Sequence, residues 1–286
     1  MVVFLIVLSK RKFPFFTAFS SLQFLVWVLY WEMKEQFIPG IYNYCDRWCE
    51  RCHFTSRCRN YESTSNLSPE QLDINNEAFW KNLSSNFKVS IELLQKAAKK
   101  FGIDLSKPFT EEEDKQYEIR KKLLDTKAKQ HPLINLCKQY RTITRPFIEN
   151  GDEVVNKSKE LVKHVHLGIK SGGEVLDTVA GIGDCFDIIQ WYLFFIEAKL
   201  HRALRGRMDG EDWEAENGFQ KDSNGSAKVA LLAIERSIEA WAKLFELLPS
   251  GEDIILNALS LLTQLKEISM KEFPEAMQFK RPGFDD

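Results

Sequence analysis

The sequence predicts an all-α protein, a multi-helix bundle that follows a short N-terminal four-cysteine metal-binding module. Two observations predict the helices. Apolar residues recur at a helical spacing along most of the chain, and no alternating Val/Ile/Thr segments bounded by turn residues recur. In keeping with the first of these observations, only 14 glycines and 9 prolines interrupt the 286 residues. A third observation predicts the module, because four of the six cysteines lie within residues 45–58.

Composition limits the partners that the chain as a whole can attract. With 44% apolar residues, the chain is long enough to bury a sizeable core. The 39 basic and 41 acidic residues leave a net charge of −2, so no overall field attracts nucleic acid or an anionic membrane. We therefore expect no nucleic-acid partner. A redox or protein partner would be recognised locally, and the sequence identifies none.

The chain divides into an apolar N-terminal segment at residues 1–34, a cysteine module at residues 35–64 and a helical bundle at residues 65–286. Residues 13–31 carry no charge, and their length is close to the minimum that spans a bilayer. Three interpretations stay open: a membrane anchor, a packed amphipathic element, or a natural start of translation at Met33. The start at Met33 predicts a cytoplasmic protein, and the anchor predicts membrane contact through residues 13–31 alone.

Helix signals follow the module in sequence order. Ser68 followed by a proline predicts a helix start, and the helical period then continues to a stop at Gly102, with a break near Asn75. Residues 110–113, Thr-Glu-Glu-Glu, form a capping box. This box predicts a charged helix that ends by Gln130, because a proline two residues later disfavours helix before it.

The later helices complete the predicted bundle, at residues 132–148, 151–168, 173–204, 226–248 and 251–271. We expect Asn224-Gly225-Ser226 to cap the fourth of these helices and Ser250-Gly251-Glu252-Asp253 to cap the fifth. The polar connection at residues 205–223 is longer than most bundle loops. We expect the tail from Phe279 to extend along the surface.

Four cysteines carry the strongest functional signal, in the pattern C-x3-C-x2-C-x5-C: Cys45, Cys49, Cys52 and Cys58. A disulfide framework would be strained over so short a segment, and four unrelated core thiols rarely occur together. We therefore predict a shared metal, because a helical turn and a two-residue knuckle bring such thiolates to one centre. A close triplet with a fourth cysteine nearby favours a [4Fe–4S] cluster, and Zn²⁺ is the alternative.

Two glutamate–histidine pairs are further candidates for chemistry. Glu160/His164 and Glu197/His201 are each four residues apart, so the members of each pair share a helix face. Ferritin-like di-iron sites use a Glu-x-x-His spacing that neither pair has, so ordinary polar pairing is the simpler interpretation. Glu197 lies in an apolar helix and needs a partner there. We expect this partner among its neighbours Lys199, His201 and Arg202.

Two resemblances add to this interpretation. The spacing of the first three cysteines, together with Ser171-Gly172-Gly173-Glu174, resembles radical S-adenosylmethionine enzymes, but the strand–helix alternation of their barrel is missing. The segments FIPGIYNYCDRWCERCHFTSRC, IIQWYLFFIEAKLHRAL, DSNGSAKVALLAIERSIEAW and KRPGFDD resemble a family of bacterial proteins that carries a YCDRWCERC-type segment before a helical body. This resemblance covers most of residues 36–286 and implies a bacterial cytosolic setting without an activity. His53 stands where we expect proline in that family, which argues against His53 as a ligand.

These observations leave three functions open. The first is a metal-binding protein whose iron–sulfur or zinc site docks on the helical bundle and responds to redox conditions. The second is an enzyme with a bundle pocket around Glu197 and His201, for which no catalytic residue is predicted. The third is a zinc-stapled interaction protein that meets an acidic partner or RNA through its arginines: Arg47, Arg51, Arg57 and Arg59.

Overall fold

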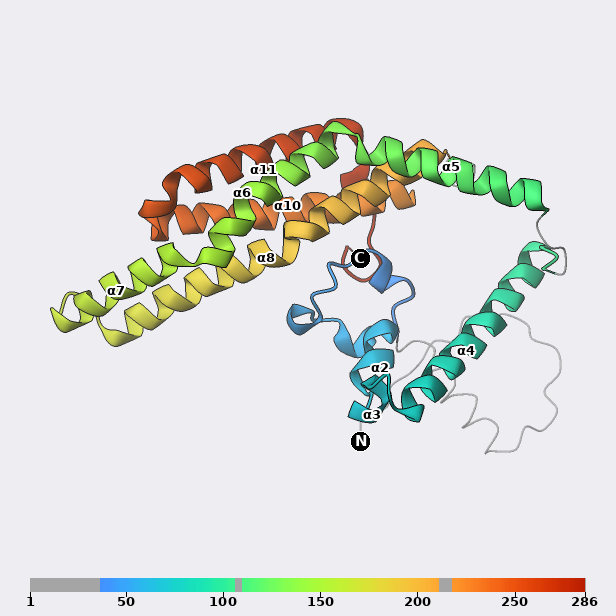
Figure 1. The fold of residues 1–286 in the computed structure, drawn as a ribbon, viewed down its shortest axis with the longest axis horizontal. Helices are drawn as coiled ribbons and strands as arrows, with labels where there is room; N and C mark the ends of the chain where they lie inside the picture. Colours follow the sequence, from blue (N-terminus) through green and yellow to red (C-terminus); the bar gives the residue numbers. More distant parts are fainter. Residues whose placement is uncertain (1–36, 106–109, 211–217, 286) are drawn as a thin grey trace, which may run out of the picture.

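A computed structural model describes residues 37–105, 110–210 and 218–285, and Figure 1 shows the fold. Over these residues the protein is all-helical, as the sequence predicts, and has no strands; its nine α-helices are more than the helices that the sequence patterns outline. The apolar N-terminal segment, including residues 13–31 and the predicted start at Met33, lies outside the described residues.

Four helices form the bundle: α6 (Pro132–Asn150), α8 (Gly172–Asp209), α10 (Asp222–Leu247) and α11 (Glu252–Glu272). They contact one another in a closed cycle, in which α8 packs on α10, α10 on α11, α11 on α6 and α6 on α8. The pair α8 and α10 makes the most extensive contact. This arrangement buries one apolar face of each helix in a common core.

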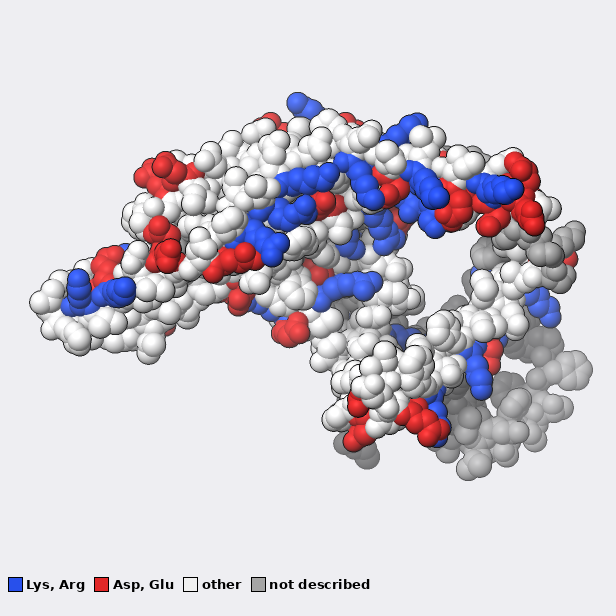
Figure 2. All heavy atoms as spheres, in the orientation of Figure 1, with Lys and Arg blue, Asp and Glu red and all other residues white. Residues whose placement is uncertain are grey.

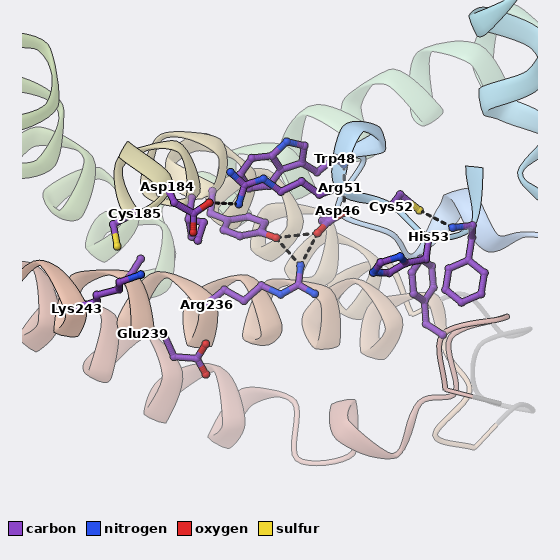
Figure 3. A pocket seen from close by; sticks show the side chains of 15 residues that line it. Asp46, Trp48, Arg51, Cys52, His53, Asp184, Cys185, Arg236, Glu239 and Lys243 are labelled. Carbon is purple, nitrogen blue, oxygen red and sulfur yellow. Dashed lines mark hydrogen bonds and ion pairs between the residues drawn. The ribbon is translucent and has the colours of Figure 1, made fainter. Parts of the chain in front are cut away.

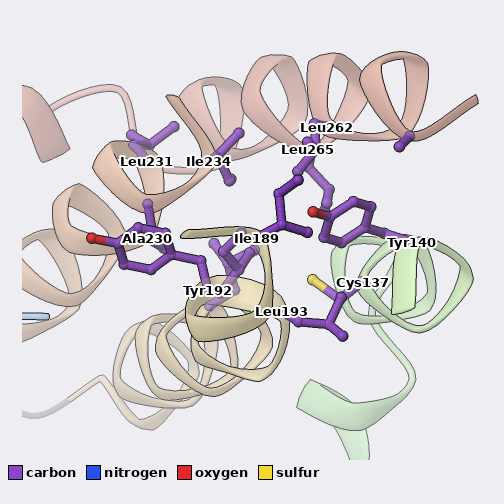
Figure 4. Close-up of a cluster of buried hydrophobic side chains, with 14 of the residues drawn as sticks. Cys137, Tyr140, Ile189, Tyr192, Leu193, Ala230, Leu231, Ile234, Leu262 and Leu265 are labelled. Carbon is purple, nitrogen blue, oxygen red and sulfur yellow. The ribbon is translucent and has the colours of Figure 1, made fainter. Parts of the chain in front are cut away.

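The bundle core consists mainly of fully buried apolar side chains. Leu200 of α8, Ile234 of α10 and Leu262 of α11 are all 0% exposed. Figure 4 shows how aliphatic side chains from these helices meet around Tyr140 of α6. The Tyr140 hydroxyl accepts a 2.9 Å hydrogen bond from Nε1 of the buried Trp241, so both aromatic side chains bury their rings without losing a polar partner.

Helix α8 is the central element of the bundle. It opens with a capping box, in which Ser171 Oγ accepts from the Glu174 N–H at 3.2 Å and the Glu174 carboxylate accepts from the Ser171 N–H at 2.7 Å. Among the described residues, α8 is the one helix long and apolar enough to cross a membrane by length and composition. Core helices pass the same test, and Ile189 and Leu200 of α8 are fully buried in the core.

The remaining helices extend from the bundle (Figure 1). They are α2 (Arg59–Ser65), α3 (Pro69–Leu72), α4 (Glu77–Phe101), α5 (Glu111–Lys129) and α7 (Asp152–His166). α7 packs along the first part of α8, and α5 joins α8 and α6 at its C-terminal end. α4 packs mainly against α3 and stands away from the bundle, so most of its side chains are exposed.

Several predicted helix boundaries are confirmed. The break near Asn75 occurs because Asn76 starts a new helix, with its side-chain oxygen accepting from the Ala78 N–H at 3.0 Å. The capping box formed by Thr110 and Glu113 opens α5, which ends before Gln130. These boundaries depend on short-range hydrogen bonds, which sequence patterns report directly.

Two expectations between residues 205 and 226 were wrong. α8 continues to Asp209 and α10 already begins at Asp222, so the connection is shorter than predicted. Asn224-Gly225-Ser226 lies inside α10, whose N-cap position is Lys221. The cause is tertiary, because Asp222 and Gly225 contact the cysteine module rather than cap the helix.

Candidate metal centre

The cysteine module contains three short 3-10 turns, η1 (Ile41–Asn43), η2 (Cys49–Arg51) and η3 (Thr55–Arg57). The N–H groups of Cys52 and Cys58 close the second and third turns by donating to the carbonyl three residues earlier, at 3.1 and 3.2 Å. Such tight turns fold the segment back on itself. As a result, one small cavity of about 20 Å³ is lined by all four predicted ligands, Cys45, Cys49, Cys52 and Cys58.

Two of these sulfur atoms form hydrogen bonds with the backbone. The Phe54 N–H, two residues after Cys52, donates to Cys52 Sγ at 3.4 Å, and the Cys45 thiol donates to the Tyr42 carbonyl at 3.6 Å. Arg47 has a φ of 59° and is the one non-glycine residue with positive φ in the described part of the chain. Amide hydrogen bonds of this kind orient metal-binding thiolates and stabilise their charge.

Electrostatics disfavour a cluster of bare thiolates in this cavity. Burial raises the pKa of Cys45. Burial also raises the pKa of Cys49, and repulsion from Cys45, Cys52 and Cys58 raises it further. Each thiolate therefore makes the next one harder to form. A cation among the sulfurs would reverse this balance, because metal coordination deprotonates thiols.

The donor set fits a soft metal centre. None of the six cysteines forms a disulfide, which argues against a disulfide framework. Four thiols around one cavity are the donors of structural zinc and of iron–sulfur clusters. As placed, however, no three His, Cys, Asp or Glu side chains among the described residues form a group that could hold an ion. Coordination therefore requires the sulfurs to move toward one another, as is common where binding and local folding are coupled.

Trp48 anchors the module on the surface of α8. Its ring stacks on Trp191 with centroids 4.9 Å apart and planes inclined by 16°. The guanidinium of Arg51 covers the same ring at 4.0 Å and pairs with Asp184 of α8 at 2.6 Å. Stacking of this kind contributes about 0.5–1.5 kcal/mol beyond burial. These contacts hold the module on α8 at Trp48, the residue directly before Cys49, which is the second predicted ligand.

Asp46 forms a second anchor between α8 and α10 (Figure 3). Tyr192 of α8 donates its hydroxyl proton to Asp46 Oδ2 at 2.7 Å, and Arg236 of α10 contacts both groups at 2.6 Å. Burial, together with the hydrogen bond to Asp46, raises the pKa of Tyr192 to about 12. The phenol therefore stays protonated and remains a donor, so one carboxylate next to Cys45 ties the module to two core helices.

Tyr44 forms a third anchor at the start of α10. Its hydroxyl donates to Asp222 Oδ1 at 2.9 Å, and its ring lies 4.5 Å from that of Phe279. A Cβ atom on Gly225 would lie 2.5 Å from a Tyr44 ring carbon, closer than packed atoms approach. The close approach of the Tyr44 ring therefore requires glycine at this position. The expected cap is wrong, because Gly225 lies inside α10.

The C-terminal tail also packs on the module instead of running along the surface as predicted. Phe279 is only 2% exposed, and Phe284 contacts Phe54 with ring centroids 4.9 Å apart. Lys228 holds the tail by donating to the carbonyl of Phe279 at 2.6 Å and by pairing with Asp285 at 2.8 Å. The tail therefore encloses one side of the cysteine segment.

A larger cavity of about 470 Å³ lies between the module, α8 and α10 (Figure 3). Cys52 and His53 line its module side, and Cys185 lines it from α8. Two of the cations on its wall, Arg51 and Arg236, are already paired with carboxylates. This cavity gives solvent-sized molecules a route to the vicinity of Cys52.

The glutamate–histidine pairs have partners of their own. Glu197 accepts from Arg141 on α6, so the partner expected for it was wrong. Glu160 pairs with Lys157 at 3.0 Å and lies 4.0 Å from His164. The three expected partners of Glu197 bind elsewhere: Lys199 to Asn43, His201 to Asp125 and Arg202 to Asp222. Neither Glu197 nor His201 lines the two cavities at the module.

Sequence reasoning missed the residues that dock the module. No docking role was predicted for Asp46 and Trp48 in the module or for their partners Tyr192 and Arg236. The sequence carried one usable signal, an acidic residue and a tryptophan between closely spaced cysteines. Their partners on α8 and α10 are distant in sequence, so their identity depended on the fold.

Comparison of the chain with protein-family models, with curated proteins and with solved structures found no match. The resemblance to bacterial proteins with a YCDRWCERC-type segment therefore stays a prediction. The function has to be argued from the site itself.

Proposed function

We propose that the protein is a metal-binding protein whose cysteine module holds a [4Fe–4S] cluster docked on the helical bundle, where the centre responds to redox conditions. One observation carries this proposal: four cysteines, none in a disulfide, line a single cavity. Cys45, Cys49, Cys52 and Cys58 would be the ligands. When bound, the cluster would supply one-electron redox chemistry.

The surroundings of the sulfurs favour iron–sulfur chemistry over zinc. The three closely spaced cysteines match the loops that bind clusters, whereas structural zinc sites draw two knuckles from separated segments. An amide hydrogen bond from Phe54 reaches Cys52, and such bonds are a recognised control of cluster potential. Trp48 and Phe54 line the same cavity and limit the access of water to it.

A redox response follows from the position of the docking residues. Asp46 and Trp48 lie between Cys45 and Cys49, and both contact α8. Any change in the centre that alters the turns of the module also alters these contacts. The proposed output is therefore a change in how tightly residues 37–58 are held on the bundle.

Anaerobic purification tests the proposal. We expect about four irons per chain and a broad absorbance near ~400 nm in the wild-type protein. Cys52→Ser should lose the metal. Cys137→Ala is the matched control, because Cys137 is buried in the bundle, where burial raises its pKa to about 12 and keeps it a neutral thiol.

Two results would contradict the proposal. Equal metal content in Cys52→Ser and in the wild type would exclude a shared cysteine site. One zinc per chain, without iron after anaerobic preparation, would replace the cluster with the zinc staple. The enzyme with a pocket around Glu197 and His201 stays a prediction that no observation here favours, since Arg141 already satisfies Glu197.

A further inference from the structure

Helix α4 presents an apolar face that no described element covers. Trp80 is 52% exposed, Phe87 60%, Ile91 52% and Leu94 57%. At 100° per residue these four side chains fall on one stripe along the helix. Large apolar side chains that line up in one exposed stripe along a helix indicate an interaction surface. Figure 1 shows that α4 stands clear of the bundle along most of its length.

Lysines lie beside one edge of this apolar stripe and on the face opposite it. α4 carries five lysines against two glutamates, although the whole chain is slightly acidic. The helical period places Lys88 and Lys99 at one edge of the stripe and Lys96 on the opposite, polar side. Figure 2 shows that much of the surface over α4 is uncharged, with basic and acidic side chains at its margin. The charge of the helix therefore differs in sign from that of the chain.

We propose that α4 binds an anionic membrane surface and lies in its plane, with the apolar stripe between the lipid headgroups and acyl chains. Aromatic and aliphatic side chains on one face, with lysines on the other, are the features of interfacial helices. The lysines complement acidic lipid headgroups. An apolar protein surface would contact only the apolar stripe, and a nucleic acid would contact only the lysines. Membrane contact would then extend beyond residues 13–31, to which the sequence confined it. The proposal does not depend on the metal centre.

Hydrogen exchange measured by mass spectrometry tests the proposal in the full-length chain. Addition of vesicles of phosphatidylglycerol and phosphatidylcholine should slow exchange in residues 77–101, and pure phosphatidylcholine should slow it less. This readout reports on α4 itself, so contact through residues 13–31 cannot imitate it. Higher salt should reduce the protection, because it screens the attraction between lysines and lipids.

A matched pair of substitutions tests the face that binds. Leu94 lies on the stripe and is 57% exposed, whereas Leu93 lies about 100° away and is 60% exposed. Leu94→Glu should reduce the vesicle-induced protection at least tenfold, and Leu93→Glu should leave most of it. Leucine and glutamate have similar helix propensities, so α4 should form in both variants. Lys88→Gln should weaken binding about fivefold.

Three outcomes would overturn the proposal. The first is vesicle binding without slower exchange in residues 77–101. The second is equal loss of protection in Leu94→Glu and Leu93→Glu. The third is protection that rises with protein concentration in the absence of lipid, which would identify a second copy of the chain as the partner of this face.

Discussion

The bundle and the cysteine module are stabilised in different ways. In the bundle, residues from four helices such as Leu200 and Trp241 are fully buried against one another. Within residues 37–64, Ile41 is the one buried residue, and every cysteine is only partly buried. The module is held from outside, by Trp48, Asp46 and Tyr44 against α8 and α10. A segment without a core of its own depends on docking contacts and on whatever its cysteines bind.

This difference predicts that the bundle folds without the metal and that the module does not. The aromatic and ionic contacts of the module are few and partly exposed, and each contributes on the order of 1 kcal/mol. Metal binding to small cysteine modules contributes about 10 kcal/mol. A metal bound as proposed would therefore decide the state of the module, whereas apolar burial would decide the state of the bundle.

Removal of the metal should have the largest effect. When the purified holoprotein is treated with a chelator, we expect protease cleavage within residues 37–64 to accelerate by at least about tenfold, while helicity stays close to its initial value. Limited proteolysis with mass spectrometry and far-ultraviolet circular dichroism would measure the two effects. Unchanged cleavage of the module after complete metal loss would show that the docking contacts alone hold it.

A cavity in the bundle core should lower the stability of the bundle and leave the metal content of the module unchanged. Leu200 is 0% exposed in α8, so Leu200→Ala should lower the free energy of unfolding by about 2–5 kcal/mol. Leu176→Ala, at a position 71% exposed on the same helix, should change it by less than about 0.5 kcal/mol. Metal content should be the same in both folded variants. A loss of metal in Leu200→Ala under folding conditions would mean that core and module are not separable.

Two glycines in the bundle helices distinguish docking from folding. Gly225→Ala should destabilise the docked state by about 1–3 kcal/mol, because the new Cβ would meet the Tyr44 ring. Gly183→Ala in α8 meets nothing within 4 Å and should instead stabilise the protein by about 0.5–1 kcal/mol. Chemical denaturation would measure both changes. A stabilising Gly225→Ala would mean that Tyr44 does not occupy this position in solution.

The same glycine shows where prediction from the sequence ends. The capping box at Thr110 and the break before Asn76 were predictable, because each depends on residues within one helical turn. Gly225 was wrongly assigned to a helix cap. Glycine is needed at this position because the ring of Tyr44, which is far away in sequence, packs against it. Likewise, Glu197 pairs with Arg141 on another helix and not with a neighbouring residue of α8.

For the candidate site, the sequence predicted the donors and not their setting. The spacing of the cysteines predicts that they act together, and all four line one cavity, but their role as ligands stays a prediction because no three of them form a group that could hold an ion as placed. The contacts of Asp46 with Tyr192 and Arg236 join three segments, so no local pattern could report them. The identity of the metal is still a prediction, because it depends on how the sulfurs converge when the ion binds.

The last prediction concerns acid and the C-terminal tail. Burial alone would raise the pKa of Asp285, but hydrogen bonds from Arg281 and Lys228 outweigh burial and hold the pKa well below its usual range. Because the folded-state pKa is lowered, this stabilisation is present above about pH 4, where the carboxyl is ionised in the unfolded chain as well. The stabilisation is lost as the pH falls from there through the folded-state pKa. Asp285→Asn should therefore cost on the order of 1 kcal/mol at neutral pH and progressively less below pH ~4. Urea unfolding of the two proteins across this range would measure the difference. If the difference in free energy of unfolding between the two proteins stayed constant down to the lowest pH, Asp285 would stabilise the tail through packing and not through its charge. The tail would then be held by packing, as the bundle is.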